Sequence, residues 1–156
     1  MLFHYMCDGY DDRGFGCVYR SVQNAVFQRG LAAPTMKRLM EAVKNPGSRW
    51  SEPAQFVQVL TDMHIRVETA LYLHNDAAAA SMMFTCPSDY RLKLGTEEMR
   101  AWLRDGMPTV WDNGTFGYTC VGDTLWDPHT TVSDDVVREF NPTHDTAPCI
   151  MALKLY

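Results

Sequence analysis

The sequence lacks paired cysteines, long apolar runs and a basic leader, and each absence excludes a class of protein. Its five cysteines are odd in number and include no Cys-x-x-Cys pair, which argues against a zinc site and a disulfide framework. No apolar run approaches the ~20 residues that span a bilayer. The opening segment MLFHYMCDGYDD has neither the basic nor the continuous apolar region of a signal peptide. We therefore expect a cytoplasmic protein that does not insert into a membrane and keeps its thiols reduced.

Basic residues are also too few and too scattered for a nucleic-acid-binding surface. The 14 lysines and arginines are outnumbered by 19 aspartates and glutamates, and no basic run is longer than Lys37-Arg38. Phosphate binding needs clustered positive charge, so we expect no nucleic-acid partner. The hydrophobic fraction of 46% is ordinary for a globular protein, and there is no internal repeat. The length predicts a single domain over residues 1–156.

Apolar periodicity predicts three helices first, then a strand, a fourth helix and a run of strands. Four helices are expected, over 17–29, 36–43, 52–63 and 97–104, with Thr35, Ser51 and Thr96 capping the last three. Strands are expected over 64–73, 109–112, 116–121, 124–126 and 149–156, with a hairpin turn at Gly122-Asp123. This order predicts an α+β fold in which a helical layer packs on a mainly antiparallel sheet.

Cys17 is the candidate nucleophile among the five cysteines. Gly14 and Gly16 allow the backbone to turn sharply just before the predicted helix, so the helix begins at the cysteine. A thiol in that position lies at the positive end of the helix dipole, which favours the nucleophilic thiolate. The alternative is a buried and inert cysteine, which is common in protein cores.

The tripeptide Asp127-Pro128-His129 supplies a candidate base. In an extended segment, residues two apart point to the same side, so this carboxylate and imidazole can approach each other. An oriented imidazole can take a proton from a thiol and later protonate a leaving amine. The alternative is an ordinary turn built from Asp and Pro. The other histidines are weaker candidates, because His64 and His74 bracket a predicted strand and His144 lies in a predicted loop.

Taken together, these motifs resemble those of one family, the peptidases specific for the ubiquitin-like modifier UFM1. The segment HYMCDGYDDRGFGCVYRS is similar to the family's nucleophile motif, which usually has tryptophan at the position of Phe15 and alanine at that of Val18. The family's catalytic Asp-Pro-His matches residues 127–129. Its oxyanion tyrosine lies twelve residues before the cysteine, where this chain has Tyr5. The segments 46–50 and 105–110 also resemble the family, so the similarity covers most of the chain.

The resemblance implies a papain-like fold and hydrolysis after the C-terminal glycine of UFM1. Cys17 would attack, His129 would act as base and then as acid, Asp127 would hold the imidazole, and Tyr5 would donate to the oxyanion. UFM1 would be the partner, as a precursor to be processed and as conjugates to be removed from lysines. No cofactor and no metal is implied. We expect a monomer, which a partner could recruit to the surface of the endoplasmic reticulum.

Three aromatic residues are candidates for the wall of a narrow substrate channel. Cleavage beside a glycine needs a channel too narrow for a side chain, and Trp50, Phe15 and Trp111 are near enough in the expected layout to form it. Two other functions stay open on the sequence alone. One is a peptidase for another modifier, such as ubiquitin or an autophagy-type modifier, and the other is a module that binds a modifier without cutting it.

Overall fold

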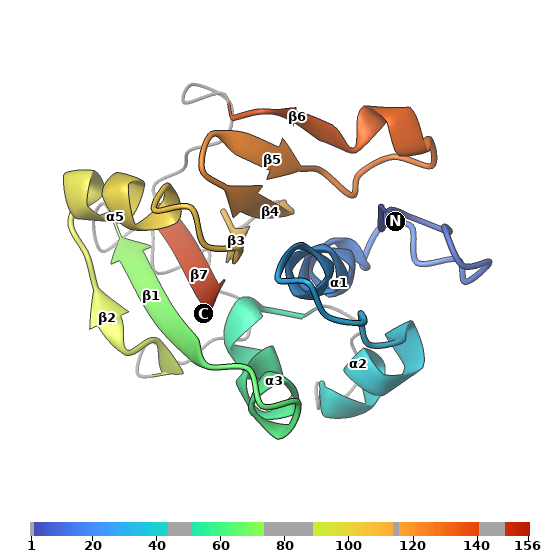
Figure 1. Cartoon of the computed structure of the whole chain (residues 1–156), viewed down its shortest axis with the longest axis horizontal. Helices are drawn as coiled ribbons and strands as arrows, with labels where there is room; N and C mark the ends of the chain where they lie inside the picture. Colours follow the sequence, from blue (N-terminus) through green and yellow to red (C-terminus); the bar gives the residue numbers. More distant parts are fainter. Residues whose placement is uncertain (1, 44–50, 74–88, 114–115, 141–148) are drawn as a thin grey trace.

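A computed structural model describes residues 2–43, 51–73, 89–113, 116–140 and 149–156. Within these residues the strands form one seven-stranded sheet in the order β2-β1-β7-β3-β4-β5-β6 (Figure 1). Only the β1–β2 pair is parallel, and the other five pairs are antiparallel. The strands are β1 (Val67–Leu73), β2 (Leu92–Lys93), β3 (Thr109–Asp112), β4 (Gly117–Val121), β5 (Thr124–Trp126), β6 (Val137–Glu139) and β7 (Cys149–Leu155). The prediction of a mainly antiparallel sheet is therefore confirmed.

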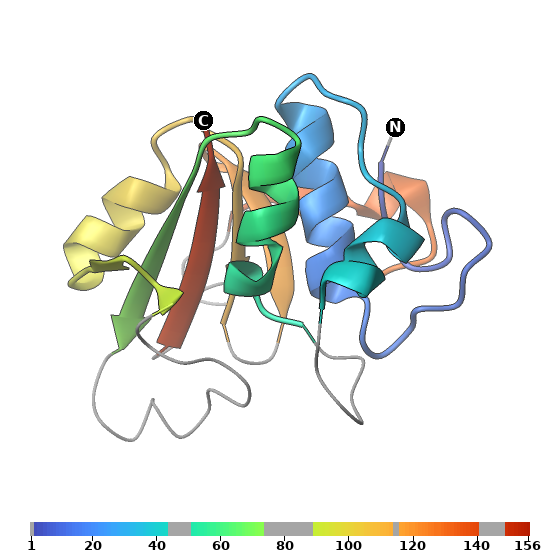
Figure 2. The same cartoon turned by 90° about the horizontal axis from the view of Figure 1, so that it is seen from below.

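Helices pack on both faces of this sheet (Figure 2). They are α1 (Cys17–Gln28), α2 (Met36–Ala42), α3 (Val57–Asp62) and α5 (Thr96–Leu103), together with short 3-10 helices at Pro53–Phe56 and Ser133–Asp135. The first core, on one face, joins α1, α2 and α3 to residues such as Val110 and Leu153. The second core, on the other face, joins α5 to Trp111 and Ala152, which directly follow Val110 and precede Leu153 along β3 and β7. The alternation follows from the two-residue period of a strand. The architecture is α+β and is compatible with the papain-like fold.

Two of the predicted helix caps are wrong. Thr35 does cap α2, because its side chain accepts the Arg38 N–H. The third helical segment is capped by Glu52 instead of Ser51, since Glu52 and Gln55 form a reciprocal capping box. The fourth is capped by the backbone of Gly95, whose carbonyl accepts the Met99 N–H at 2.8 Å, so Thr96 is already helical.

Strand β1 starts three residues later than the sequence predicts, because the turn that ends α3 extends to Ile65. His64 adopts a φ of +61°, and the N–H of Ile65 reaches back to the Leu60 carbonyl at 3.0 Å. A residue in this left-handed conformation directly after a helix is usually glycine. Gly30 occupies the equivalent position after α1, with a φ of +88°.

This comparison predicts that His64→Gly stabilises the protein. A side chain in the left-handed region costs about 1 kcal/mol, which glycine avoids. We expect a higher free energy of unfolding by up to about 1 kcal/mol in chemical denaturation. Gly30→Ala is the matched control and should lower the free energy of unfolding. A His64→Gly variant less stable than the parent would show that the imidazole makes contacts that outweigh the backbone strain.

Candidate active site

The backbone before α1 places Cys17 at the first position of the helix. Gly14 has a φ of +90°, and Gly16 is the N-cap residue. A Cβ atom at Gly16 would lie only 1.8 Å from the Asp12 Oδ2 atom, so no larger residue fits there without moving Asp12. The Cys17 residue itself is buried, with 4% of its surface exposed. The predicted glycine turn before the cysteine is present, and one of its glycines is required by a buried carboxylate.

Arg20 ties the loop before Cys17 to the helix that follows. Its side chain is completely buried, and its Nε and Nη2 donate to the two carboxylate oxygens of Asp12 at 2.9 and 3.0 Å. Asp8 accepts two more hydrogen bonds from the same guanidinium, both at 3.0 Å. Asp12 Oδ1 also accepts the backbone N–H of Met6 at 2.9 Å. The ion pair of Arg20 and Asp12 therefore fixes the segment that contains Tyr5 relative to α1.

Sequence reasoning missed this ion pair. Asp12 and Arg20 lie within the motif around Cys17, but nothing in the sequence says that both side chains are buried. A usable signal was Arg20, a charged residue in the otherwise apolar first turns of the predicted helix. A charge buried at such a position needs a partner of opposite charge, which Asp12 provides.

Tyr5 contacts both halves of the candidate site. Its backbone N–H donates to the Pro128 carbonyl at 3.2 Å, and its ring lies edge-on against the imidazole of His129 with centroids 5.7 Å apart. Its side chain packs against the core cluster that contains Cys17, and its hydroxyl is close enough to the thiol for the two groups to interact electrostatically. Burial raises the pKa of Tyr5 well above its usual value; the charge that Cys17 carries once ionised and the carboxylates of Asp12 and Asp127 raise it further. The hydroxyl thus keeps its proton and remains a hydrogen-bond donor at neutral pH.

His129 and Asp127 form a close pair at the end of β5. The Asp127 Oδ1 atom accepts from the His129 Nδ1 at 2.6 Å and from the His129 backbone N–H at 3.0 Å. Burial alone would raise the pKa of Asp127, but the hydrogen bonds from His129 and the positive charges of His129 and Arg138 outweigh it, so the pKa lies below its usual value. Asp127 is therefore ionised at neutral pH and fixes the proton of the imidazole on Nδ1.

The thiol of Cys17 is protonated at neutral pH, contrary to the expectation from the helix dipole. Burial raises the pKa of Cys17 to about 12, and the nearby carboxylate of Asp112 raises it too. Backbone N–H groups, including that of Gly117, act in the opposite direction but are outweighed. A Cβ atom at Gly117 would lie 2.8 Å from Val18, so β4 and the start of α1 are in close contact. The sequence predicted the position of the thiol correctly but not its protonation, because burial decides the latter.

The three predicted channel residues have different outcomes. Trp111 is completely buried in the second core, against Tyr118 at 4.9 Å, on the sheet face opposite α1. It is a packing residue, and its prediction as a channel wall is wrong. Phe15 is half-buried beside the first core and contacts the rings of Tyr10 and Tyr19. Trp50 lies outside the described residues.

One aromatic residue that the sequence analysis missed does lie beside the candidate base. Phe116 is exposed over 39% of its surface, and its ring centroid is 4.8 Å from that of His129. It precedes β4, so its exposed face borders the imidazole. An exposed phenylalanine against a candidate catalytic histidine is suited to contact a bound substrate.

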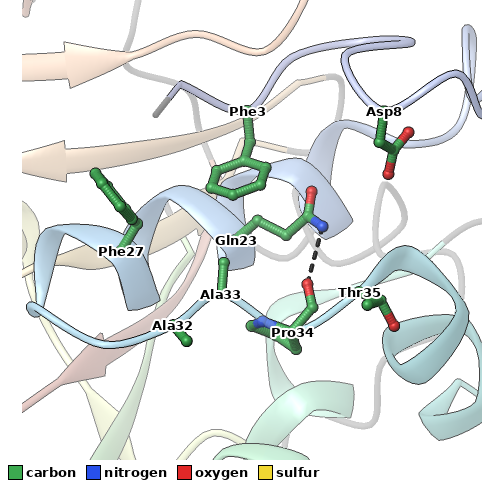
Figure 3. Close-up of a pocket in the computed structure, with 8 residues that line it drawn as sticks. All are labelled: Phe3, Asp8, Gln23, Phe27, Ala32, Ala33, Pro34 and Thr35. Carbon is green, nitrogen blue, oxygen red and sulfur yellow. Dashed lines mark hydrogen bonds between the residues drawn. The ribbon is translucent and has the colours of Figure 1, made fainter.

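A separate groove is bordered by α1, the N-terminal segment and the connection from α1 to α2 (Figure 3). Its volume is about 390 Å³. A hydrogen bond of 2.9 Å from the Gln23 side chain to the Pro34 carbonyl joins two of its lining residues. The groove is lined by Phe3, Asp8, Gln23, Phe27, Ala32, Ala33, Pro34 and Thr35. None of the four candidate catalytic residues lines it.

Within the described part of the chain, no group of three or more His, Cys, Asp or Glu side chains is arranged to hold a metal ion. Among the same described residues, no helix is both long and apolar enough to cross a bilayer.

Comparison with known proteins gives relatives of one kind. No family model matches the chain. Ufm1-specific protease 2 of Gallus gallus is 29% identical, over 85% of this chain and 32% of that protein, and the Homo sapiens protein is 26% identical, over 85% and 31%. Ufm1-specific protease 1 of Mus musculus is 39% identical over 33% of this chain. The chain is a distant relative of the Ufm1-specific proteases. It spans about a third of the length of the curated relatives it matches.

The buried ion pair gives a stability prediction. Asp12→Ala leaves the completely buried Arg20 without its closest partner, and Asp8 compensates only in part. We expect a loss of about 3 kcal/mol in the free energy of unfolding, as is typical when one partner of a buried ion pair is removed. Asp11→Ala is the matched control, because Asp11 pairs with Arg13 at the surface and should matter little. Equal losses in the two variants would refute the structural role of Asp12.

Proposed function

We propose that this protein is a thiol peptidase that cleaves after the C-terminal glycine of UFM1. The observation that carries the proposal is the contact of Tyr5 with both Cys17 and His129. Its side chain packs against the core cluster that contains Cys17, its hydroxyl interacts electrostatically with the thiol, and its ring lies against an imidazole whose Nδ1 is bound by Asp127. A nucleophile, a base with its orienting carboxylate and a hydrogen-bond donor thus come from three separate parts of the chain.

In the proposed reaction, His129 takes the proton of the Cys17 thiol as the sulfur attacks the carbonyl carbon of the scissile glycine. Because the resting thiol is protonated, this base is needed for every turnover. The Tyr5 hydroxyl and the Cys17 backbone N–H donate to the developing oxyanion. His129 then gives its proton to the leaving amine, and a thioester remains. Water, activated by His129, hydrolyses the thioester and regenerates the thiol.

The choice of UFM1 as substrate is supported by the relatives of this chain, which are Ufm1-specific proteases. The same chemistry would process a UFM1 precursor and remove UFM1 from conjugated lysines, since both bonds follow the same glycine. In this proposal Phe116, whose ring centroid lies 4.8 Å from that of His129, would contact the glycine tail. The cytoplasmic location and the monomeric state expected from the sequence stay predictions.

The test is a reaction with UFM1 that carries a C-terminal electrophile, followed by peptide mapping of the adduct. We expect the adduct on Cys17. The main competitor is Cys7, which is half-exposed and lies 3.4 Å from the Arg20 guanidinium. A Cys7→Ser variant is the matched control and should react normally, whereas Cys17→Ser should not react. Cleavage of a UFM1 fusion is measured with the same three proteins.

The same experiment with matched ubiquitin and autophagy-type probes separates the alternative functions. Labelling of Cys7 would overturn the assignment of the nucleophile. Labelling of Cys17 by a ubiquitin probe as fast as by the UFM1 probe would overturn the substrate while keeping the chemistry. Tight binding of UFM1 without an adduct and without cleavage would identify a non-catalytic module.

A further inference from the structure

We propose that Arg138 is a positioning residue that holds Asp127, and through it His129, in the orientation needed for proton transfer. The proposal rests on the function proposed above for its catalytic consequence. Arg138 lies on the three-residue strand β6, and the sequence patterns did not identify it as a site residue.

The two oxygens of Asp127 have separate partners. Oδ1 accepts from the His129 ring at 2.6 Å and from its backbone N–H at 3.0 Å. Oδ2 accepts from the Nε and Nη2 atoms of Arg138, both at 3.4 Å. The two nitrogens form one side of the planar guanidinium fork, and both donate to this one oxygen, so the fork holds Oδ2 and leaves Oδ1 to His129. Asp127 is therefore held from both sides.

The backbone also fixes Arg138 in place. Strand β6 pairs with β5 so that Arg138 lies opposite Leu125, and the Asp127 N–H donates to the Val136 carbonyl at 2.7 Å. The guanidinium carbon of Arg138 lies 5.4 Å from the ring centroid of Tyr118, and that ring lies 5.3 Å from the ring of His129. Arg138 thus contacts both groups that orient the imidazole, the carboxylate on one side and the tyrosine ring on another.

Arg138 is the permanent positive charge beside Asp127, and it adds to the hydrogen bonds from His129 that favour the ionised carboxylate. Asp127 faces His129 from its own segment, Arg138 from β6 and Tyr5 from the N-terminal segment. Of these, only Arg138 is positive at every pH of interest. The positive charge of Arg138 contributes to the lowered pKa of Asp127. Both side chains keep some exposure, at 30% and 22%, so the pair serves geometry more than stability.

The experiment compares Arg138→Ala and Arg138→Lys with the parent. Arg104→Ala is the matched control, because Arg104 also pairs with a carboxylate, Asp123, and also stacks on a ring, Phe140, but does not touch Asp127. Two measurements are made on each protein. One is the pH profile of kcat/KM for a UFM1 fusion, and the other is the NMR signal of the hydrogen-bonded Nδ1–H proton of His129.

For Arg138→Ala we expect kcat/KM to fall by about tenfold or more, because a misoriented base is costly. The acid limb of its profile should move to higher pH, since Asp127 loses the cation that favours its charged form. Its Nδ1–H signal should exchange faster with water than in the parent. Arg138→Lys should recover part of the rate, because one ammonium can replace the charge but not the fork. Arg104→Ala should match the parent in both measurements.

An Arg138→Ala protein with the parent's rate, acid limb and Nδ1–H signal would overturn the proposal. If that variant does not fold, Arg138→Lys decides, and parent-like values in it for all three readouts would overturn the role of the fork. A parent protein that fails to cleave UFM1 would overturn the proposed function instead. The Nδ1–H signal then still decides whether Arg138 positions His129, because that measurement needs no substrate.

Discussion

The buried ion pair between Arg20 and Asp12 is the interaction on which the arrangement of the site depends. Both side chains are completely enclosed, so neither charge is tolerable without the other. Asp12 uses the same carboxylate to accept the Met6 N–H, one residue after Tyr5. Its backbone carbonyl accepts the N–H of Gly16, one residue before Cys17. One pair thereby sets the distance between the candidate oxyanion donor and the nucleophile.

The second half of the site is fixed by packing against the sheet. Helix α1 lies across β3 and β4, with Gly117 against Val18 and the Thr119 hydroxyl donating to the Ser21 carbonyl. Strand β5 pairs with β4 and ends at Trp126, so the Asp127-Pro128-His129 segment leaves the sheet beside the start of α1. The bond from the Tyr5 N–H to the Pro128 carbonyl then joins the two halves. Residues more than a hundred positions apart meet because both are anchored to β4.

The parts of the site that the sequence predicted are those encoded in local spacing. The glycine turn before Cys17 requires only nearby residues, and the pairing of Asp127 with His129 follows from the period of an extended chain. The helices and longer strands were predicted for the same reason. The strands β2 and β6 are two and three residues long, too short to show a period, and so Arg138 was not recognised.

What the sequence could not predict depends on burial. The pKa of Cys17 is decided by how deeply α1 sits on the sheet, and that depth has no local signal. Trp111 has the same alternation as Val110, so periodicity could not say which of them faces the candidate site. The buried state of Asp12 and Arg20 is likewise a property of the assembled fold. Cys17 and Trp111 were identified from the sequence without their environment, whereas Asp12 and Arg20 were not identified at all.

A double-mutant cycle on kcat between Asp12→Asn and Tyr5→Phe tests most directly whether Asp12 acts by placing Tyr5. Tyr5→Phe alone should slow cleavage by roughly 10²–10³, the loss of one oxyanion donor. Asp12→Asn should also slow cleavage in the parent, measured where every variant is folded. In the Tyr5→Phe background, Asp12→Asn should have little further effect, because the group it positions is already gone. Losses that multiply, or an Asp12→Asn variant with the parent's kcat, would contradict this account.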